Sequence, residues 1–190
     1  MARVTALRER GERVDVELDG AAWRTVPLDA AAGAGLHVGL ELDRPRLREL
    51  RRALRRANAS ARALRALRAR DLAASELDAR LARAGFTTAE RAEAVARLER
   101  TGLVDDTALA LRRAAALAER GHGDAAIRWD LDRRGVAPEH VEAAVAALAP
   151  ERERAQEIVA ARGRGAATAR YLARRGFDAE TVDGAVGTDG

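Results

Sequence analysis

Residues 1–43 alternate between apolar and polar positions with the period of two that is typical of β-strands. Val14, Val16 and Leu18 occupy every second position, and Asp19-Gly20 follows at once. This dipeptide favours a two-residue hairpin turn, because both turn positions need positive φ. We therefore expect a small antiparallel sheet, with a first strand over 3–9, a central strand over 14–18, a returning strand over 22–26 and a fourth strand over 36–42.

After this segment the apolar positions recur every three or four residues, as in an amphipathic helix. Leu47, Leu50 and Leu54 lie on one face of the helix, and arginines lie on the opposite face. Asn58-Ala59-Ser60 indicates a break, after which a second arginine-bearing helix begins.

The remainder of the chain contains an internal repeat. The pattern Leu-x-Arg-x-Gly-apolar occurs at 81–86, 131–136 and 172–177. Basic residues in a last helical turn, followed by glycine, predict a helix end. A second helix then begins, with the capping box Thr87-x-x-Glu90 in the first copy and the first-turn proline Pro138 in the second. An upstream helix completes each copy, over about 60–70, 107–120 and 151–162.

The sequence thus predicts a mainly α protein. Tandem three-helix repeats are expected to stack into an elongated curved body, preceded by a small N-terminal antiparallel β unit. The expected boundaries are 1–43 for the β unit, 44–104 for the basic helix with the first repeat, 105–149 for the second repeat and 150–190 for a third, degenerate repeat.

Composition excludes much of catalytic chemistry. The chain has no cysteine, and all 34 of its basic residues are arginine. Thiolate nucleophiles, Cys-ligated metals, Schiff-base lysines and the phosphate-loop lysine are therefore excluded. The three histidines are scattered, and neither Ser60 nor Ser75 lies in a nucleophile motif. We expect no enzyme activity, no catalytic residue, no metal and no cofactor.

Charge is distributed unevenly. Residues 44–70 hold eleven arginines and one acid, Glu49, whereas the whole chain has a net charge of +4. Such an asymmetry indicates a nucleic-acid or acidic-protein partner, although a solvated helix surface accommodates arginines equally well. The candidate nucleic-acid-binding residues are Arg48, Arg51, Arg52, Arg55, Arg56, Arg62 and Arg65.

Neither a signal sequence nor a membrane span is indicated. The longest stretch without Asp, Glu or Arg runs from Ala30 to Leu40, which is shorter than the roughly 20 residues that span a bilayer. The N-terminus lacks an apolar signal core. We expect a cytoplasmic monomer without membrane contact.

The run Gly102-Leu-Val-Asp-Asp-Thr-Ala-Leu-Ala110 resembles a signature of the RecX family, the cytosolic regulators of the bacterial recombinase RecA. Leu109 stands where the family usually has phenylalanine. Residues 127–136, from Ile127 to Val136, are similar to a second family motif. Within the first run, we expect Asp105 and Asp106 to cap the helix that starts near Thr107.

The resemblance implies binding of RecA, especially RecA assembled on single-stranded DNA. It further implies damped filament extension, ATP hydrolysis and strand exchange in recombination, DNA repair and the SOS response. Arginine is enriched at interface hot spots, and we expect the partner contacts to lie on arginines of the central repeat. For Arg133 and Arg134, a role at the end of a helix explains their presence equally well. The candidates are Arg112, Arg113, Arg120, Arg128, Arg133 and Arg134. The alternative is a DNA-binding protein without sequence specificity, acting through residues 44–70.

Overall fold

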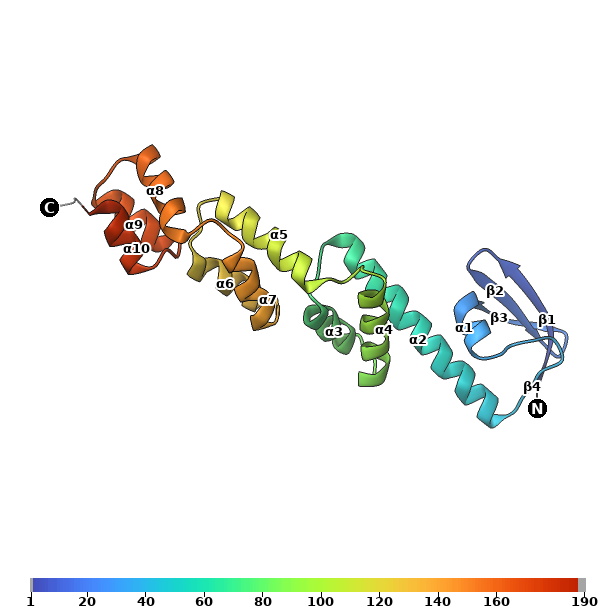
Figure 1. Cartoon of the computed structure of the whole chain (residues 1–190). Helices are drawn as coiled ribbons and strands as arrows, with labels where there is room; N and C mark the ends of the chain where they lie inside the picture. The colour runs from blue at the N-terminus through green and yellow to red at the C-terminus, as the bar shows by residue number, and fades with distance from the viewer. Residues whose placement is uncertain (1, 188–190) are drawn as a thin grey trace. The chain divides into compact units, whose positions relative to one another are not determined.

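The computed structural model describes residues 2–187 (Figure 1). It is mainly helical with a small antiparallel sheet near the N-terminus, as the sequence predicts. The chain divides into two compact units. Unit 1 comprises the residues up to Arg70 together with Asp78–Arg100, and unit 2 comprises Asp71–Leu77 together with the residues from Thr101 onward. No helix within residues 2–187 is long and apolar enough to cross a membrane.

The sheet of unit 1 has the strand order β3-β2-β1-β4, with every neighbouring pair antiparallel. The predicted alternation is confirmed, because Val14 and Val16 are buried against Val4. Asp19 and Gly20 have φ values of 49° and 82°, as the predicted hairpin turn requires. The strands are β1 Ala2–Arg10, β2 Arg13–Leu18, β3 Ala21–Pro27 and β4 Glu41–Leu42.

The expected fourth strand over 36–42 is mostly wrong. Only Glu41–Leu42 pairs with β1, and Leu28–Gly33 forms a short helix, α1, that the sequence pattern did not predict. Gly39 has φ of 89°, and its N–H donates to the Val4 carbonyl at 2.8 Å. This left-handed conformation interrupts an extended strand, so the apolar alternation here marks a packed turn.

The expected break at residues 58–60 is also wrong, because a single helix, α2, runs over Arg44–Ala69. The Asp43 carboxylate caps it by accepting the Arg46 N–H at 2.8 Å. Asn and Ser disfavour a helix less than Gly does and far less than Pro does. Ala59 lies between them and is fully buried, so packing holds the helix through this point.

Two further helices follow, α3 over Ala74–Arg83 and α4 over Thr88–Arg100. Helix α4 packs on α2, as α1 does, while the boundary between the units falls inside α3. The predicted capping box is confirmed. The Thr87 N–H donates to the Glu90 carboxylate at 2.8 Å, and the Glu90 N–H donates to the Thr87 hydroxyl at 3.4 Å.

Six helices of unit 2 complete the second and third repeats. In the second repeat, the predicted helix after the glycine does begin with Pro138 in its first turn. One apolar core lies among the helices of the second repeat, centred on Ile127 and Leu131, and another lies within the third, centred on Leu172. The helices are α5 Asp106–Glu119, α6 Asp124–Arg133, α7 Pro138–Ala146, α8 Glu151–Arg162, α9 Ala166–Arg174 and α10 Ala179–Val186.

The repeated glycine ends the middle helix of every repeat, as predicted. Gly85, Gly135 and Gly176 have φ values of 82°, 75° and 83°. In the second repeat the Gly135 N–H donates to the Asp132 carbonyl at 2.8 Å, and the Val136 N–H donates to the Leu131 carbonyl at 3.2 Å. This pair of bonds is the Schellman motif, which satisfies the last carbonyls of a helix.

Successive repeats join through the same glycines. The Gly135 carbonyl accepts the Ser75 hydroxyl at 2.6 Å, and the Gly176 carbonyl accepts the Ala125 N–H at 3.2 Å. Gly135 therefore contacts the first turn of α3, and Gly176 contacts the first turn of α6. In each case the contacted helix is the middle helix of the preceding repeat. A Cβ atom at Gly123 would lie 2.3 Å from the Phe177 backbone nitrogen, so the approach of the two backbones excludes a side chain there.

Acidic residues at the start of a repeat also contact the preceding repeat. The prediction for Asp105 is confirmed, since it accepts the Ala108 N–H of α5 at 2.9 Å. Asp106 instead caps α3, because it accepts the Ala74 N–H at 2.9 Å. Glu151 serves α6 in the same way by accepting the Asp124 N–H at 2.5 Å. The paired aspartates thus join two helices instead of capping one.

Candidate interaction surfaces

Most of the candidate nucleic-acid-binding arginines lie exposed along α2. Within residues 2–187 their guanidinium groups form no hydrogen bond or ion pair. Near the start of the helix, Arg44, Arg48 and Arg51 surround Leu47 and line a shallow hollow of about 320 Å³. Free guanidinium groups with this spacing can bind phosphates or carboxylates. The exposed candidates that have no partner among residues 2–187 are Arg48, Arg51, Arg52, Arg62 and Arg65.

Arg55 and Arg56 differ from these because α4 supplies them with acids. Arg55 donates to both oxygens of the Glu90 carboxylate, at 2.6 and 3.0 Å, and to the Gly85 carbonyl at 2.9 Å. The hydrogen bond from Arg55 lowers the pKa of Glu90 to about 2. Arg56 lies 3.0 Å from Glu93. Arg55 therefore fastens α2 to the capped start of α4.

The candidate partner-binding arginines of the central repeat are mostly engaged inside unit 2. Arg113 donates to both oxygens of Asp130, at 2.8 and 2.9 Å, and Arg134 donates to the same carboxylate at 2.9 Å. The hydrogen bond from Arg113 lowers the pKa of Asp130 to about 2. Arg128 makes a bidentate contact with Glu142 at 2.8 and 3.0 Å. These pairs fasten α6 to α5 and to α7.

The other members of this set are more accessible. Arg112 contacts Asp71 at 2.9 Å, but both side chains are more than half exposed. Arg120 has no acidic partner within residues 2–187. Arg133 lies over the Trp129 ring, 5.2 Å from its centroid. The structure therefore brings Arg113, Arg128 and Arg134 into internal contacts and leaves Arg120 and Arg133 available.

Arg154 is a structural residue that sequence reasoning missed. It is only 9% exposed, and its side chain donates to the carbonyls of Ala149 and His122 at 3.0 and 2.8 Å, and to the Asp124 carboxylate. It also lies over the Phe177 ring at 5.8 Å. The local sequence does not distinguish Arg154 from Arg152, which lies two residues earlier and is exposed.

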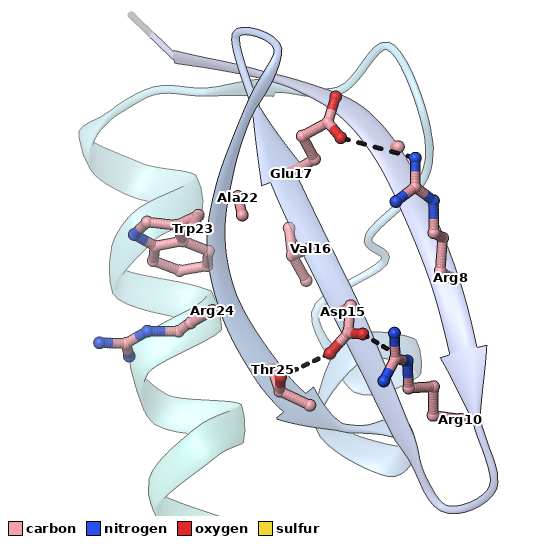
Figure 2. A pocket seen from close by; sticks show the side chains of 10 residues that line it. Arg8, Arg10, Asp15, Val16, Glu17, Ala22, Trp23, Arg24 and Thr25 are labelled. Carbon is pink, nitrogen blue, oxygen red and sulfur yellow. Dashed lines mark hydrogen bonds and ion pairs between the residues drawn. The ribbon is translucent and has the colours of Figure 1, made fainter.

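The outer face of the sheet carries a hollow of about 370 Å³ (Figure 2). Trp23 lies at its edge with Arg24 stacked 4.7 Å from the ring centroid. Arg8 and Arg10, which also line it, are turned toward acids of β2, and Arg10 lies 2.8 Å from Asp15. The hollow therefore offers no cluster of free cations. Among residues 2–187, no group of His, Asp and Glu side chains could hold a metal ion.

Solved structures share this fold. A crystal structure of regulatory protein RecX matches 97% of this chain and 98% of its own length, with a TM-score of 0.81 and 20% sequence identity. The chain has the RecX fold. The crystal structure of RecX from Lactobacillus salivarius matches 70% of this chain and 94% of its own length, with a TM-score of 0.60 and 15% identity. No protein-family model matches the sequence, and no curated protein matches it either.

The RecX fold confirms the resemblance drawn from the sequence at the level of architecture. The run over 102–110 carries that resemblance, and its two aspartates cap α5 and α3. The two aspartates of the motif are therefore explained by how repeats join. Exposed residues that could contact a partner include Leu103 within this run, the arginines of α2 and the outer side of α6.

Proposed function

We propose that this chain is a cytoplasmic regulator of the RecA recombinase. It binds RecA and the filament that RecA forms on single-stranded DNA, and it limits filament extension, ATP hydrolysis and strand exchange during recombination and repair. The observation that carries the proposal is the agreement with the fold of regulatory protein RecX over 97% of this chain and 98% of that chain. The run over 102–110 supports it, because this run resembles a signature of the RecX family.

The test is ATP hydrolysis by RecA on single-stranded DNA, with this protein titrated from far below equimolar amounts. A regulator that blocks extension acts on filament ends or grooves, so hydrolysis should fall at a small fraction of the RecA concentration. The inhibition should persist at two salt concentrations, because the contact is not mainly with phosphates. Unchanged hydrolysis at every ratio would contradict the proposal.

A second candidate function is direct DNA binding by α2, supported by its exposed arginines without acidic partners. Phosphate contacts of this kind confer affinity without sequence preference. The informative variant replaces Arg48, Arg51 and Arg52 by Gln and leaves Arg55 intact, because Arg55 fastens α2 to α4. On single-stranded DNA the slope of log affinity against log salt should fall by about 2, since each phosphate that an arginine neutralises contributes about 0.7 to it.

A matched variant controls for net charge. Replacing Arg152, Arg164 and Arg170 by Gln removes the same charge from exposed positions of unit 2. If DNA binds through α2, this control keeps the affinity and salt slope of the unmodified chain. An equal decrease in both variants would mean that overall charge, and not α2, determines DNA binding.

A further inference from the structure

Trp129 projects directly away from the core of unit 2. It is 62% exposed, more than any other large apolar side chain within residues 2–187. Ile127 and Leu131, two positions before and after it on α6, are fully buried. Because a helix turns about 100° per residue, Trp129 lies about half a turn from the mean direction of these two. The indole therefore contributes nothing to the core on which α6 packs.

Helix α6 holds this indole on a rigid support. On one flank Arg128 is paired with Glu142 of α7, and on the other flank Asp130 is held by Arg113 of α5. The first turn is held by Glu151, which accepts the Asp124 N–H. Binding through a helix fixed from three directions costs little backbone conformational freedom.

The charge around Trp129 distinguishes this surface from α2. Arg133 is exposed and stacked on the indole, while the cations on the two flanks are neutralised by their acids. Asp132 is exposed beside Arg133. One available cation next to a carboxylate fits a polyanion poorly, whereas an exposed Trp with a stacked Arg is typical of protein interface hot spots.

We propose that Trp129 and Arg133 form the anchor by which unit 2 docks on a protein whose surface presents a carboxylate beside an apolar recess. Trp129 fills the recess and Arg133 meets the carboxylate. This inference rests on the proposed function, in which that protein is RecA. It assigns the protein contact to α6 and the polyanion contact, if any, to α2.

The test compares Trp129→Ala with Trp23→Ala for binding to RecA filaments on oligodeoxythymidine. Trp23 is the matched control, because it is the chain's other tryptophan and also stacks on an arginine, Arg24. Trp129→Ala should weaken binding by about thirtyfold, the effect of a hot spot, and Trp23→Ala by less than about twofold. Both variants should retain the helical circular-dichroism spectrum, because neither indole is buried.

Two other results would contradict the proposed function or this inference. If the unmodified chain does not bind filaments, the proposed function fails and this inference fails with it. If it binds, and Trp129→Ala binds equally well with its fold intact, only the inference fails.

Two measurements without RecA exclude other occupants of the surface. In a Trp23→Phe chain, Trp129 is the remaining tryptophan, and oligodeoxythymidine alone should leave its fluorescence unchanged. Quenching would mean base stacking and would overturn the protein assignment. Sedimentation should show no self-association that Trp129→Ala abolishes, since such an effect would mean that a second copy covers the indole.

Discussion

Helix α2 and the central repeat use the same basic residue for different purposes. In unit 2, Arg113 and Arg128 pair with carboxylates of neighbouring helices, and Arg134 pairs with Asp130 of its own helix. In unit 1, most arginines of α2 extend into solvent with no acidic partner among residues 2–187, and Arg55 and Arg56 are exceptions because they contact Glu90 and Glu93. Whether an arginine is paired depends on the number of acidic residues nearby. Residues 44–70 contain a single acid, whereas the segments around α6 alternate arginines with aspartates and glutamates.

A count of arginines therefore does not locate a binding surface. An arginine in a bidentate pair has its donors occupied, and a partner would have to displace a well-placed carboxylate. An arginine without an acid has its donors solvated and available. Replacing a paired arginine should therefore lower the stability of the fold, whereas replacing an arginine without an acidic partner should weaken binding.

The largest expected effect is on stability, at Arg154. Replacing it with Met leaves the Asp124 carboxylate and two carbonyls of unit 2 without their donor, and breaking a buried pair costs about 3 kcal/mol. Urea unfolding should show this decrease, while the exposed neighbour variant Arg152→Met should stay within about 0.5 kcal/mol. A decrease below about 1 kcal/mol for Arg154→Met would contradict its structural role.

A smaller effect, dependent on pH, is expected at Asp130. Its folded-state pKa is about 2, below the unfolded value near 3.9. The resulting stabilisation is present above the unfolded pKa and is lost as pH falls toward 2. Asp130→Asn should cost about 1 kcal/mol at pH 7, reduced by solvent screening, and the difference from the unmodified chain should shrink as the pH falls from about 4 through about 2.

The neighbouring variant Asp132→Asn is the control for that experiment, because Asp132 is exposed on the same helix. Its stability should follow that of the unmodified chain at every pH. If Asp132→Asn flattened the acid transition as much as Asp130→Asn, the Arg113–Asp130–Arg134 contacts would not be its source.

On α2 the comparison can be tested within one helix. Arg55→Gln should lower the melting temperature, because it removes the contacts with Glu90 and with the Gly85 carbonyl. Arg51→Gln, one turn away and exposed, should leave the melting temperature unchanged. Equal melting temperatures for the two variants would mean that the pairing of Arg55 is not structural.

The smallest effect is expected at Arg112. Its contact with Asp71 is exposed on both sides, and such pairs contribute 0.2–1 kcal/mol, or about 0.5 kcal/mol here. Arg112→Gln should therefore change stability by no more than about that amount in urea unfolding. If the free energy of unfolding decreased as much as in Arg154→Met, the exposed pair of Arg112 would be as stabilising as the buried pair of Arg154, which contradicts this account.

The sequence predicts the features that depend on neighbouring residues. The glycines that end the middle helices, the Thr87–Glu90 capping box and the start at Pro138 are all local signals, and all are confirmed. The continuity of α2 was not predictable in this way, since it depends on packing that buries Ala59. Helix α1 and the turn at Gly39 likewise depend on contacts with the sheet.

The candidate surfaces were predictable only in part. The arginine-rich helix is evident from charge alone, but which arginines are paired depends on partners such as Glu90, which lies 35 residues from Arg55. Trp129 carries a signal in the sequence, because it lies opposite Ile127 and Leu131 on a helical wheel. No local pattern distinguishes Arg154, because its partners come from the turn before α6 and the loop before α8.

The most direct test of the proposed function is RecA ATP hydrolysis on single-stranded DNA with the chain in which Arg48, Arg51 and Arg52 are replaced by Gln. These residues are exposed on α2, and within the described part of the chain their side chains form no hydrogen bond or ion pair with another helix. We predict that the unmodified chain and this variant both inhibit hydrolysis at a small fraction of the RecA concentration. Inhibition by the unmodified chain that needs DNA-coating amounts and disappears in the variant would contradict RecA regulation and identify α2 as the functional site.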